Sequence, residues 1–241
     1  MSDSPEGPGW WQASDGKWYP PEQAPGYQQP GAAGGATGGT DLGTVFQFAW
    51  NKFIQNIGEW VVLWLILVGL FILYIVVTII AAVGGAVGGF SFRFNIIGLV
   101  IGLIFGAIQG IALVAINKGA VMAANGQKVD VGAAFKLTGN NILAGAVFGV
   151  IFGLLYSLCS IFGVIAFLFF GFVPALSALD DKGAEALSES INISTTHTNE
   201  AMLWQVISWL LTGFICFIGA PIGALGSVYL VKSYRGEPVA P

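Results

Sequence analysis

Few side chains in this sequence could perform acid–base, nucleophilic or metal chemistry. The single histidine, His197, lies in a polar segment, where we expect a solvated side chain rather than a general base. Asp180, Asp181, Glu185 and Glu189 form an acidic patch that could hold a divalent cation, although a solvated helix start is the more ordinary interpretation. We recognise no nucleophile motif, phosphate loop or paired-histidine zinc motif. The sequence therefore predicts no catalytic residue, no metal site and no cofactor.

Glycine rows spaced by four residues are the strongest local signal. The rows are Gly98, Gly102, Gly106 and Gly110, then Gly145, Gly149 and Gly153, and finally Gly219 with Gly223. Glycine costs a helix about 1 kcal/mol relative to alanine, but such rows let helix backbones approach closely in a membrane. We expect helix packing within one bundle; a homo-oligomer interface or a flexible, pore-lining seam are the alternatives. Gln109, beside the first row, should bond a neighbouring helix, with pore lining as its alternative role.

Residues 1–40 differ in composition from the rest of the chain and hold most of its prolines. Residues 1–19 contain an aromatic island whose four large rings are Trp10, Trp11, Trp18 and Tyr19. The pair Asp15-Gly16 between the rings predicts a β-hairpin, which is marginal alone in water and should become firm on a partner or a lipid surface. Residues 20–40, rich in Pro, Gly, Gln and Ala, predict a disordered linker.

The 241 residues are 55% hydrophobic and only 9% charged, whereas soluble domains carry about a quarter charged residues. The formal net charge of −4 excludes a basic surface for nucleic acid. These values predict an integral membrane protein, an all-α polytopic bundle, over residues 41–237, with a short C-terminal tail at 238–241. Its first partner is therefore the lipid bilayer.

Long charge-free stretches locate the membrane spans, since a helix needs about 20 apolar residues to cross the hydrocarbon. They predict spans near 60–82, 95–116, 142–160 and 163–179, with a turn at Ser160–Gly163 and a kink at Pro174. Residues 201–234 are long for one span and short for two, with Pro221 as the natural break. The positive-inside rule favours six spans with both termini in the cytoplasm of a bacterial inner membrane, because only Arg93 then lies outside.

This topology predicts roles for several further side chains. Aromatic residues at the cytoplasmic ends of spans should form an interfacial belt: Trp50, Phe53, Trp60, Trp64, Trp204 and Trp209. Lys232 should snorkel from a short last span. Hydroxyl side chains inside the spans, including Ser177, Ser208 and Thr212, can bond their own helix backbones.

Three cytoplasmic segments are alike and indicate an internal repeat. Residues 41–53, 130–142 and 181–193 each begin Asp-x-Gly, continue with apolar residues at helical spacing and precede a predicted membrane hairpin. Asp41, Asp130 and Asp181 can each cap a helix start. The unit is then an interfacial helix plus a two-helix hairpin, used three times; the alternative is that any helix entering a membrane needs an N-cap.

Three segments carry a resemblance to known proteins: TVFQFAWN at 44–51, FVPALSALDDKGAEALSES at 172–190 and YLVKSYRG at 229–236. Over roughly residues 41–237 the chain resembles bacterial six-helix, glycine-rich membrane proteins, including the membrane domain of some glycerophosphodiester phosphodiesterases. The aromatic island resembles a short N-terminal module of bacterial membrane proteins. The resemblance implies a six-helix membrane fold and carries no catalytic residue to this chain, which has no phosphodiesterase domain.

Taken together, these patterns predict a structural or adaptor protein. The N-terminal motif would recruit a cytoplasmic protein partner, and the bundle would anchor it and could form a homo-oligomer. A channel or transporter for an uncharged solute is the alternative, with the glycine rows as a mobile seam around Gln109. The lack of ionisable residues inside the predicted spans disfavours ion-coupled transport.

Overall fold

The structure is a computed structural model that describes residues 11–12, 18–19, 41–87, 91–158, 160–214 and 216–240. The chain divides into two compact units, residues 1–36 and residues 37–241, which we call the tail unit and the helical unit. The elements are β1 (Trp11–Gln12), β2 (Trp18–Tyr19), α1 (Leu42–Gln55), α2 (Ile57–Val87), α3 (Ser91–Ala124), α4 (Val131–Ala134), α5 (Gly139–Leu158), α6 (Ser160–Phe170), α7 (Val173–Asp180), α8 (Ala186–Thr196), α9 (Thr198–Phe214) and α10 (Cys216–Tyr234).

The tail unit contains the hairpin pairing that the aromatic island predicts. Strands β1 and β2 are antiparallel, with Trp11 opposite Tyr19 and Gln12 opposite Trp18. The predicted turn at Asp15-Gly16 lies outside the described residues. Trp10 and the predicted linker at 20–40 lie outside the described residues.

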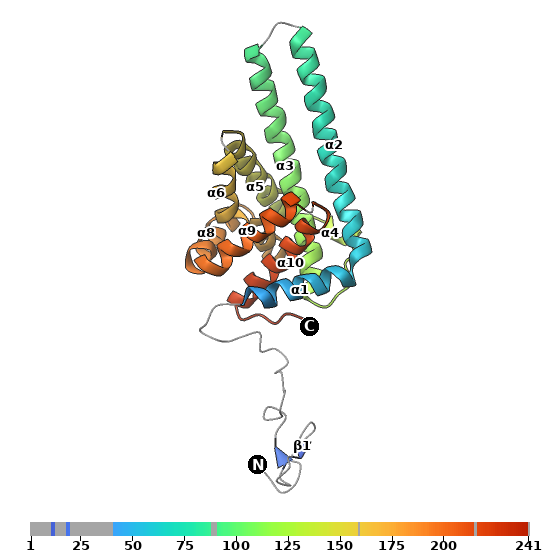
Figure 1. Cartoon of the computed structure of the whole chain (residues 1–241), viewed down its shortest axis with the longest axis vertical. Coiled ribbons are helices and arrows are strands. Elements are labelled where there is room, and N and C mark those ends of the chain that lie inside the picture. Colours follow the sequence, from blue (N-terminus) through green and yellow to red (C-terminus); the bar gives the residue numbers. More distant parts are fainter. Residues whose placement is uncertain are drawn as a thin grey trace. The chain divides into compact units, whose positions relative to one another are not determined.

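The helical unit is built from three helical hairpins, each preceded by a shorter helix. Helix α1 precedes the hairpin of α2 and α3, α4 precedes α5 and α6–α7, and α8 precedes α9 and α10. Figure 1 shows α2 and α3 as the longest pair, with α1 crossing near the end of the unit where α2 begins. The order of a short helix and a hairpin therefore recurs at the three places where the Asp-x-Gly pattern occurs.

Two of the three predicted aspartate caps are present. Asp41 accepts hydrogen bonds from the amides of Gly43 (3.3 Å) and Thr44 (3.1 Å), and Asp130 accepts one from Ala133 (2.9 Å). These bonds satisfy amides that the first helical turn leaves unpaired.

The cap predicted for Asp181 is wrong. This residue ends α7 in the left-handed conformation, with φ of 56°. Its carboxylate accepts a hydrogen bond from the Thr138 hydroxyl, and its carbonyl accepts one from Asn140 Nδ2 at 3.0 Å. Helix α8 starts later, after Glu185. These two bonds connect Asp181, at the end of the second hairpin, to the start of α5 in the same hairpin. Asp181 therefore does not begin the third repeat.

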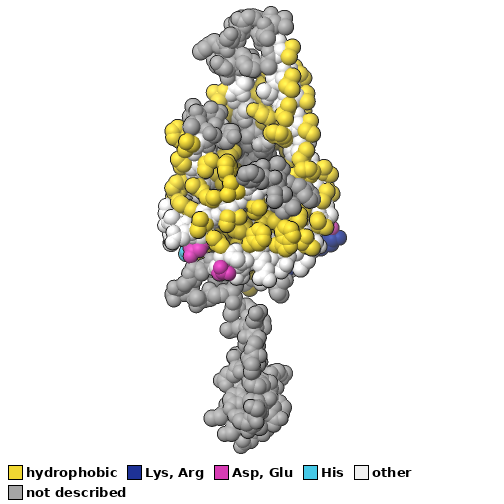
Figure 2. Space-filling view, in the orientation of Figure 1, with side chains coloured by type: hydrophobic (Ala, Val, Ile, Leu, Met, Phe, Trp, Pro, Cys, Tyr) yellow, Lys and Arg dark blue, Asp and Glu magenta, His cyan; other side chains and the backbone are white. Residues whose placement is uncertain are grey.

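Within the described residues, three stretches are long and apolar enough to cross a membrane: Ile57–Ala81, Gly98–Ala124 and Ile161–Asp180. The third is broken between Phe170 and Val173, where Pro174 lies in the first turn of α7, so the predicted interruption at Pro174 is confirmed. The turn predicted at Ser160–Gly163 is wrong because α6 already begins at Ser160. The membrane character of the helical unit agrees with Figure 2, in which hydrophobic side chains cover the visible face and charged ones gather near the lower margin of that unit.

The prediction that Pro221 separates two helices is also wrong, since Pro221 lies inside α10. Helix α9 ends at Phe214, and α10 begins at Cys216. A proline removes one backbone hydrogen bond, and a helix packed against protein on several sides tolerates that loss. Helix α10 is packed in this way, because it contacts α1, α2, α3, α7 and α9.

The core lies around α10, which is buried continuously from Pro221 to Lys232. Three members of the predicted aromatic belt, Trp60, Trp204 and Phe53, are buried in this core rather than facing headgroups, whereas Trp50 and Trp209 are exposed. Lys232 does not snorkel to solvent: it is 7% exposed and donates a hydrogen bond to Asn125 Oδ1 at 2.7 Å.

Residues 238–240, predicted as a separate tail, return to the helical unit. The Ala240 amide donates to the carbonyl of Ala124 at 2.8 Å, and Val239 packs against the core.

Candidate functional site

A cavity of about 550 Å³ lies where the three hairpins meet. Its walls come from α2, α3, α5, α6, α7, α9 and α10, and five aromatic rings contribute to them: Phe71, Phe148, Phe152, Phe167 and Trp209. None of the described residues that line it carries a charge. The volume falls within the range of pockets that hold small organic molecules.

Three buried polar side chains in this cavity have an atom without a hydrogen-bond partner. These atoms are Asn117 Oδ1, Gln205 Nε2 and Ser208 Oγ. Their side chains are 6%, 1% and 4% exposed, respectively. A buried polar group without a partner costs about 1–3 kcal/mol, so a ligand toward which these side chains turn, and which supplies the missing bonds, would recover free energy at this place.

Local packing explains why these side chains are held in place. The Asn117 amide donates to the carbonyl of Leu113 at 2.9 Å, one turn back on α3, so that its oxygen alone remains unpaired. On α9, Trp204 Nε1 donates to the carbonyl of Gly223 at 3.2 Å. This bond ties the helix that carries Gln205 to α10 at a position that lines the cavity.

Glycines on α10 make this close contact feasible. A Cβ at Gly226 would overlap the Trp204 ring, one at Gly219 would overlap the backbone of Leu211 and Thr212, and one at Gly223 would lie 3.1 Å from Ser208 Cβ. Gly219, Gly223 and Gly226 therefore allow α9 to pack closely against α10.

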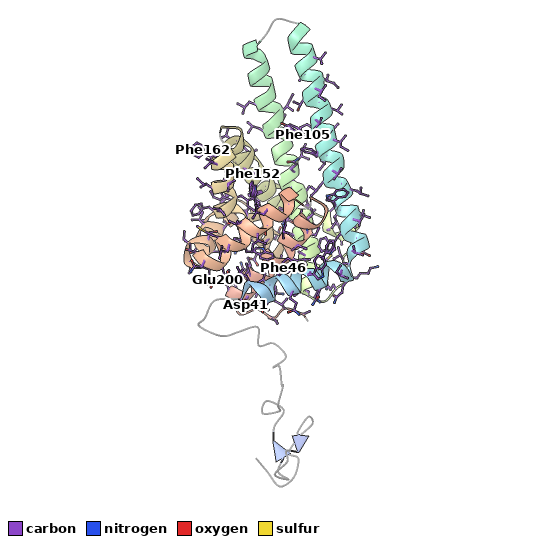
Figure 3. All side chains as sticks on the ribbon, in the orientation of Figure 1. Asp41, Phe46, Phe105, Phe152, Phe162 and Glu200 are labelled. Atoms are coloured by element: carbon purple, nitrogen blue, oxygen red, sulfur yellow. The ribbon has the colours of Figure 1, made fainter. Side chains whose placement is uncertain are left out.

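A second cavity of about 600 Å³ lies between α2, α3 and α5. Gln109 lines this cavity, together with Gly98, Gly102, Gly106, Gly110, Gly149 and Gly153. The two cavities share four lining residues, Phe71, Leu113, Phe148 and Phe152, all of them apolar. Figure 3 shows Phe152 at a level between Glu200 and Asp41 at one end of the helical unit and the far ends of α2 and α3.

The long glycine rows divide into packed and open positions. A Cβ at Gly110 would overlap the carbonyl of Gly145, and one at Gly149 would overlap the carbonyl of Gly106, so α3 and α5 touch backbone to backbone there. Gly153 faces Gly102 more loosely, its Cβ position lying 3.8 Å from the Gly102 carbonyl oxygen. Among the described residues, no atom of a neighbouring element lies within 4 Å of a Cβ at Gly98 or Gly102.

Two of the four carboxylates of the acidic patch, Asp180 and Glu189, belong to an ion-pair cluster, whereas Glu185 is exposed at the start of α8. Arg235 Nη2 contacts Asp180 Oδ2 and Glu189 Oε1, each at 2.6 Å, and Lys182 pairs with the same two carboxylates. Burial by itself raises the pKa of Glu189, but the hydrogen bonds from Lys182 and Arg235 outweigh it, and the net pKa is lowered. The hydrogen bond to Asp180 raises the pKa of the Arg235 guanidinium. In the described part of the chain, no group of three His, Cys, Asp or Glu side chains is arranged to hold a metal ion.

His197 is half-buried, whereas the sequence predicts a solvated side chain. Its ring stacks on Tyr234, with centroids 3.8 Å apart and an interplanar angle of 3°. Together with the Arg235 cluster, this stack fixes the end of α10 to α8.

The sequence patterns predict a role for Gln109 but not for Asn117 or Gln205. Each of these two amides lies in a nearly charge-free stretch, and this position could have identified it, because a polar side chain deep in a membrane needs a partner. Ser208 was expected to bond its own helix and does not, whereas Thr212 does, donating to the carbonyl of Ser208 at 2.8 Å. Ser177 accepts a hydrogen bond from Asn141 Nδ2 at 3.1 Å.

Comparisons with known proteins add no relative: no family model, no curated protein and no solved structure matches the chain. The resemblance to six-helix bacterial membrane proteins therefore stays a prediction.

Proposed function

We propose that this protein binds an uncharged molecule in the central cavity and moves it within or across the membrane. The observation that carries the proposal is the set of unpartnered polar atoms of Asn117, Gln205 and Ser208 in a cavity with aromatic walls. The absence of charge among the described lining residues favours a neutral ligand, because an ion would lose its hydration without compensation.

The proposed topology has six crossings with both termini in the cytoplasm of a bacterial inner membrane. Three hairpins support it, although α9 and α10, with 17 and 19 residues, are only about 26 and 28 Å long at 1.5 Å per residue. Asp41 and Glu200, which begin α1 and α9, lie at the same end of the helical unit in Figure 3, as this topology requires. An enzyme reporter fused after Pro241 should be active only in the cytoplasm; activity on the other side would contradict six crossings.

Transport can be tested with the full chain in liposomes. One arm follows the flux of uncharged water-soluble solutes, glycerol and erythritol, and a second follows the transbilayer movement of an uncharged fluorescent acylglycerol. We expect movement in one arm, reduced by Gln205→Leu and by Ala220→Trp, which fills the cavity. Gln109→Leu, in the second cavity, is the matched control. Movement that is absent in both arms, or equally unaffected by all three variants, would contradict the proposal.

A second candidate function is recruitment of a cytoplasmic protein by the tail unit. The pairing of Trp11 with Tyr19 and of Gln12 with Trp18 favours it, because a two-stranded hairpin gains stability when a partner covers it. Replacing Trp10, Trp11 and Trp18 with alanine should abolish capture of that partner while leaving the helical unit folded. Unchanged capture by the triple variant would rule out this role.

A further inference from the structure

The mouth of the central cavity is formed by a few exposed residues. Among the residues that line it, Phe71 on α2 and Trp209 and Thr212 on α9 are exposed, with Phe71 at 52% and Trp209 at 38%. The other lining residues are buried or half-buried. The cavity therefore opens sideways, between α2 and α9, through a rim that is mostly aromatic.

This mouth lies far from the charged end of the helical unit. Phe71 follows Glu59 by 12 residues on α2, and Thr212 follows Glu200 by 12 residues on α9. At 1.5 Å per residue, each is about 18 Å along its helix from the charged residue. The hydrocarbon core of a bilayer is about 30 Å thick, so Phe71, about 18 Å along α2 from Glu59, lies at a level where acyl chains surround a spanning helix.

The side chains common to both cavities are apolar. Phe71, Leu113, Phe148 and Phe152 line the central cavity and the second cavity alike. A hydrated solute that passed between these side chains would lose hydrogen bonds to water. A molecule already dissolved in the bilayer would instead reach the lateral mouth without leaving an apolar phase.

The polar side chains of the central cavity favour a ligand that both donates and accepts hydrogen bonds. Gln205 Nε2 is a donor, Asn117 Oδ1 is an acceptor, and the Ser208 hydroxyl can act as either. A hydroxyl group satisfies a donor and an acceptor at once, whereas an ester or a ketone can only accept. With roughly 30 Å³ per water molecule, 550 Å³ has room for about 18 waters, enough for a small polar head and part of one chain.

We propose that the ligand is an uncharged lipid with hydroxyl groups, which enters from the bilayer between α2 and α9. Its hydroxyl end binds Gln205, Asn117 and Ser208, and its chain leaves past Phe71 and Trp209 into the acyl region. This inference rests on the proposed function of the cavity and adds the class of the ligand and its route.

The test uses the full chain in lipid nanodiscs and a monoacylglycerol that carries a diazirine in its acyl chain. After illumination, we expect crosslinks at the mouth, in the peptides around Phe71 and Trp209. Unlabelled monoacylglycerol should compete, and glycerol at the same concentration should not. Gln205→Leu should reduce labelling about 5- to 10-fold, the effect of one or two hydrogen bonds, and Ala220→Trp should abolish it. Gln109→Leu should leave labelling unchanged, and size-exclusion profiles report whether each variant folds.

Two other outcomes would overturn this inference. Labelling spread along the outer face of α2, at Leu65, Ile72 and Ile79, and insensitive to Gln205→Leu and Ala220→Trp, would indicate annular lipid only. Competition by glycerol as strong as that by monoacylglycerol would replace the lipid with a water-soluble ligand, and the proposed function of the cavity would stand. The proposed transport function is contradicted by a different result, namely that neither liposome arm shows movement that depends on Gln205.

Discussion

Exchanging glycine for alanine at Gly149 and at Gly102 should change stability in opposite directions. Both positions belong to the four-residue glycine rows on α3 and α5, but their surroundings differ. A Cβ at Gly149 would overlap the carbonyl oxygen of Gly106 and lie 2.6 Å from its carbon and 3.1 Å from the amide nitrogen of Ala107. These are backbone atoms, so relief requires α3 and α5 to separate. A Cβ at Gly102 would meet no atom of another element within 4 Å in the part of the chain that the structure describes.

The difference in the free energy of unfolding between the two variants measures the cost of placing a methyl group in the contact between α3 and α5. Alanine favours a helix over glycine by about 1 kcal/mol at either site, so helix propensity cancels in the comparison. Forcing an extra methyl group into a packed interface costs about 1–3 kcal/mol. We therefore expect the Gly149→Ala protein to be about 1–3 kcal/mol less stable than the Gly102→Ala protein. At about 2–4 °C per kcal/mol for a chain of this size, the unfolding temperatures should differ by about 2–12 °C.

Thermal unfolding of the purified full chain in detergent, followed by circular dichroism, measures this difference. The unsubstituted protein should unfold between the two variants, about 1 kcal/mol below Gly102→Ala. Equal unfolding temperatures for Gly149→Ala and Gly102→Ala would contradict the backbone contact between α3 and α5. A less stable Gly102→Ala protein would instead indicate a helix packed on the open end of the row, such as one from a second copy of the chain.

The ends of the helices give further predictions. Arg235→Leu should lower the free energy of unfolding by about 1–3 kcal/mol, between the values for surface and buried ion pairs, because Asp180 and Glu189 lose a shared partner. Lys128→Leu removes a side chain that is 80% exposed from its pair with Glu59, so it should lower the free energy of unfolding by less than Arg235→Leu does in the same denaturation assay. The lowered pKa of Glu189 means that its contribution is fully present above the ordinary value of 4.5 and is lost as the pH falls through the lower folded value; unfolding temperatures between pH 7 and pH 3 should decline in the unsubstituted protein and decline less in Arg235→Leu. Asp41→Ala should remove about 1 kcal/mol by uncapping α1, with Asp41→Asn recovering most of it.

Local chemistry made part of this fold predictable. The caps at Asp41 and Asp130 depend on residues within one turn, and the break near Pro174 depends on a proline without an amide hydrogen. The existence of apolar helices follows equally from composition over a window of about 20 residues. Such features do not require knowledge of what a helix packs against.

Features that depend on packing between helices could not be predicted from the hydropathy pattern of the sequence. Trp60 and Trp204 looked like interfacial anchors because their helices are apolar on most sides, and hydropathy cannot tell a protein-facing side from a lipid-facing one. Pro221 looked like a break because the contacts that surround α10 are invisible in sequence. The central cavity was missed for the same reason: Asn117 and Gln205 belong to different hairpins, and only the fold shows that they line one space.

The burial of α10 sets an order for biogenesis. Helix α1 has Val45, Ala49 and Phe53 in the core and contacts α10, yet about 160 residues separate the two helices in the chain. At 5–20 residues per second, α1 waits roughly 8–30 s after its own synthesis before that partner exists. During this interval the membrane surface is the natural shelter for its apolar side. The first two hairpins are therefore synthesised around an incomplete centre that the final hairpin closes.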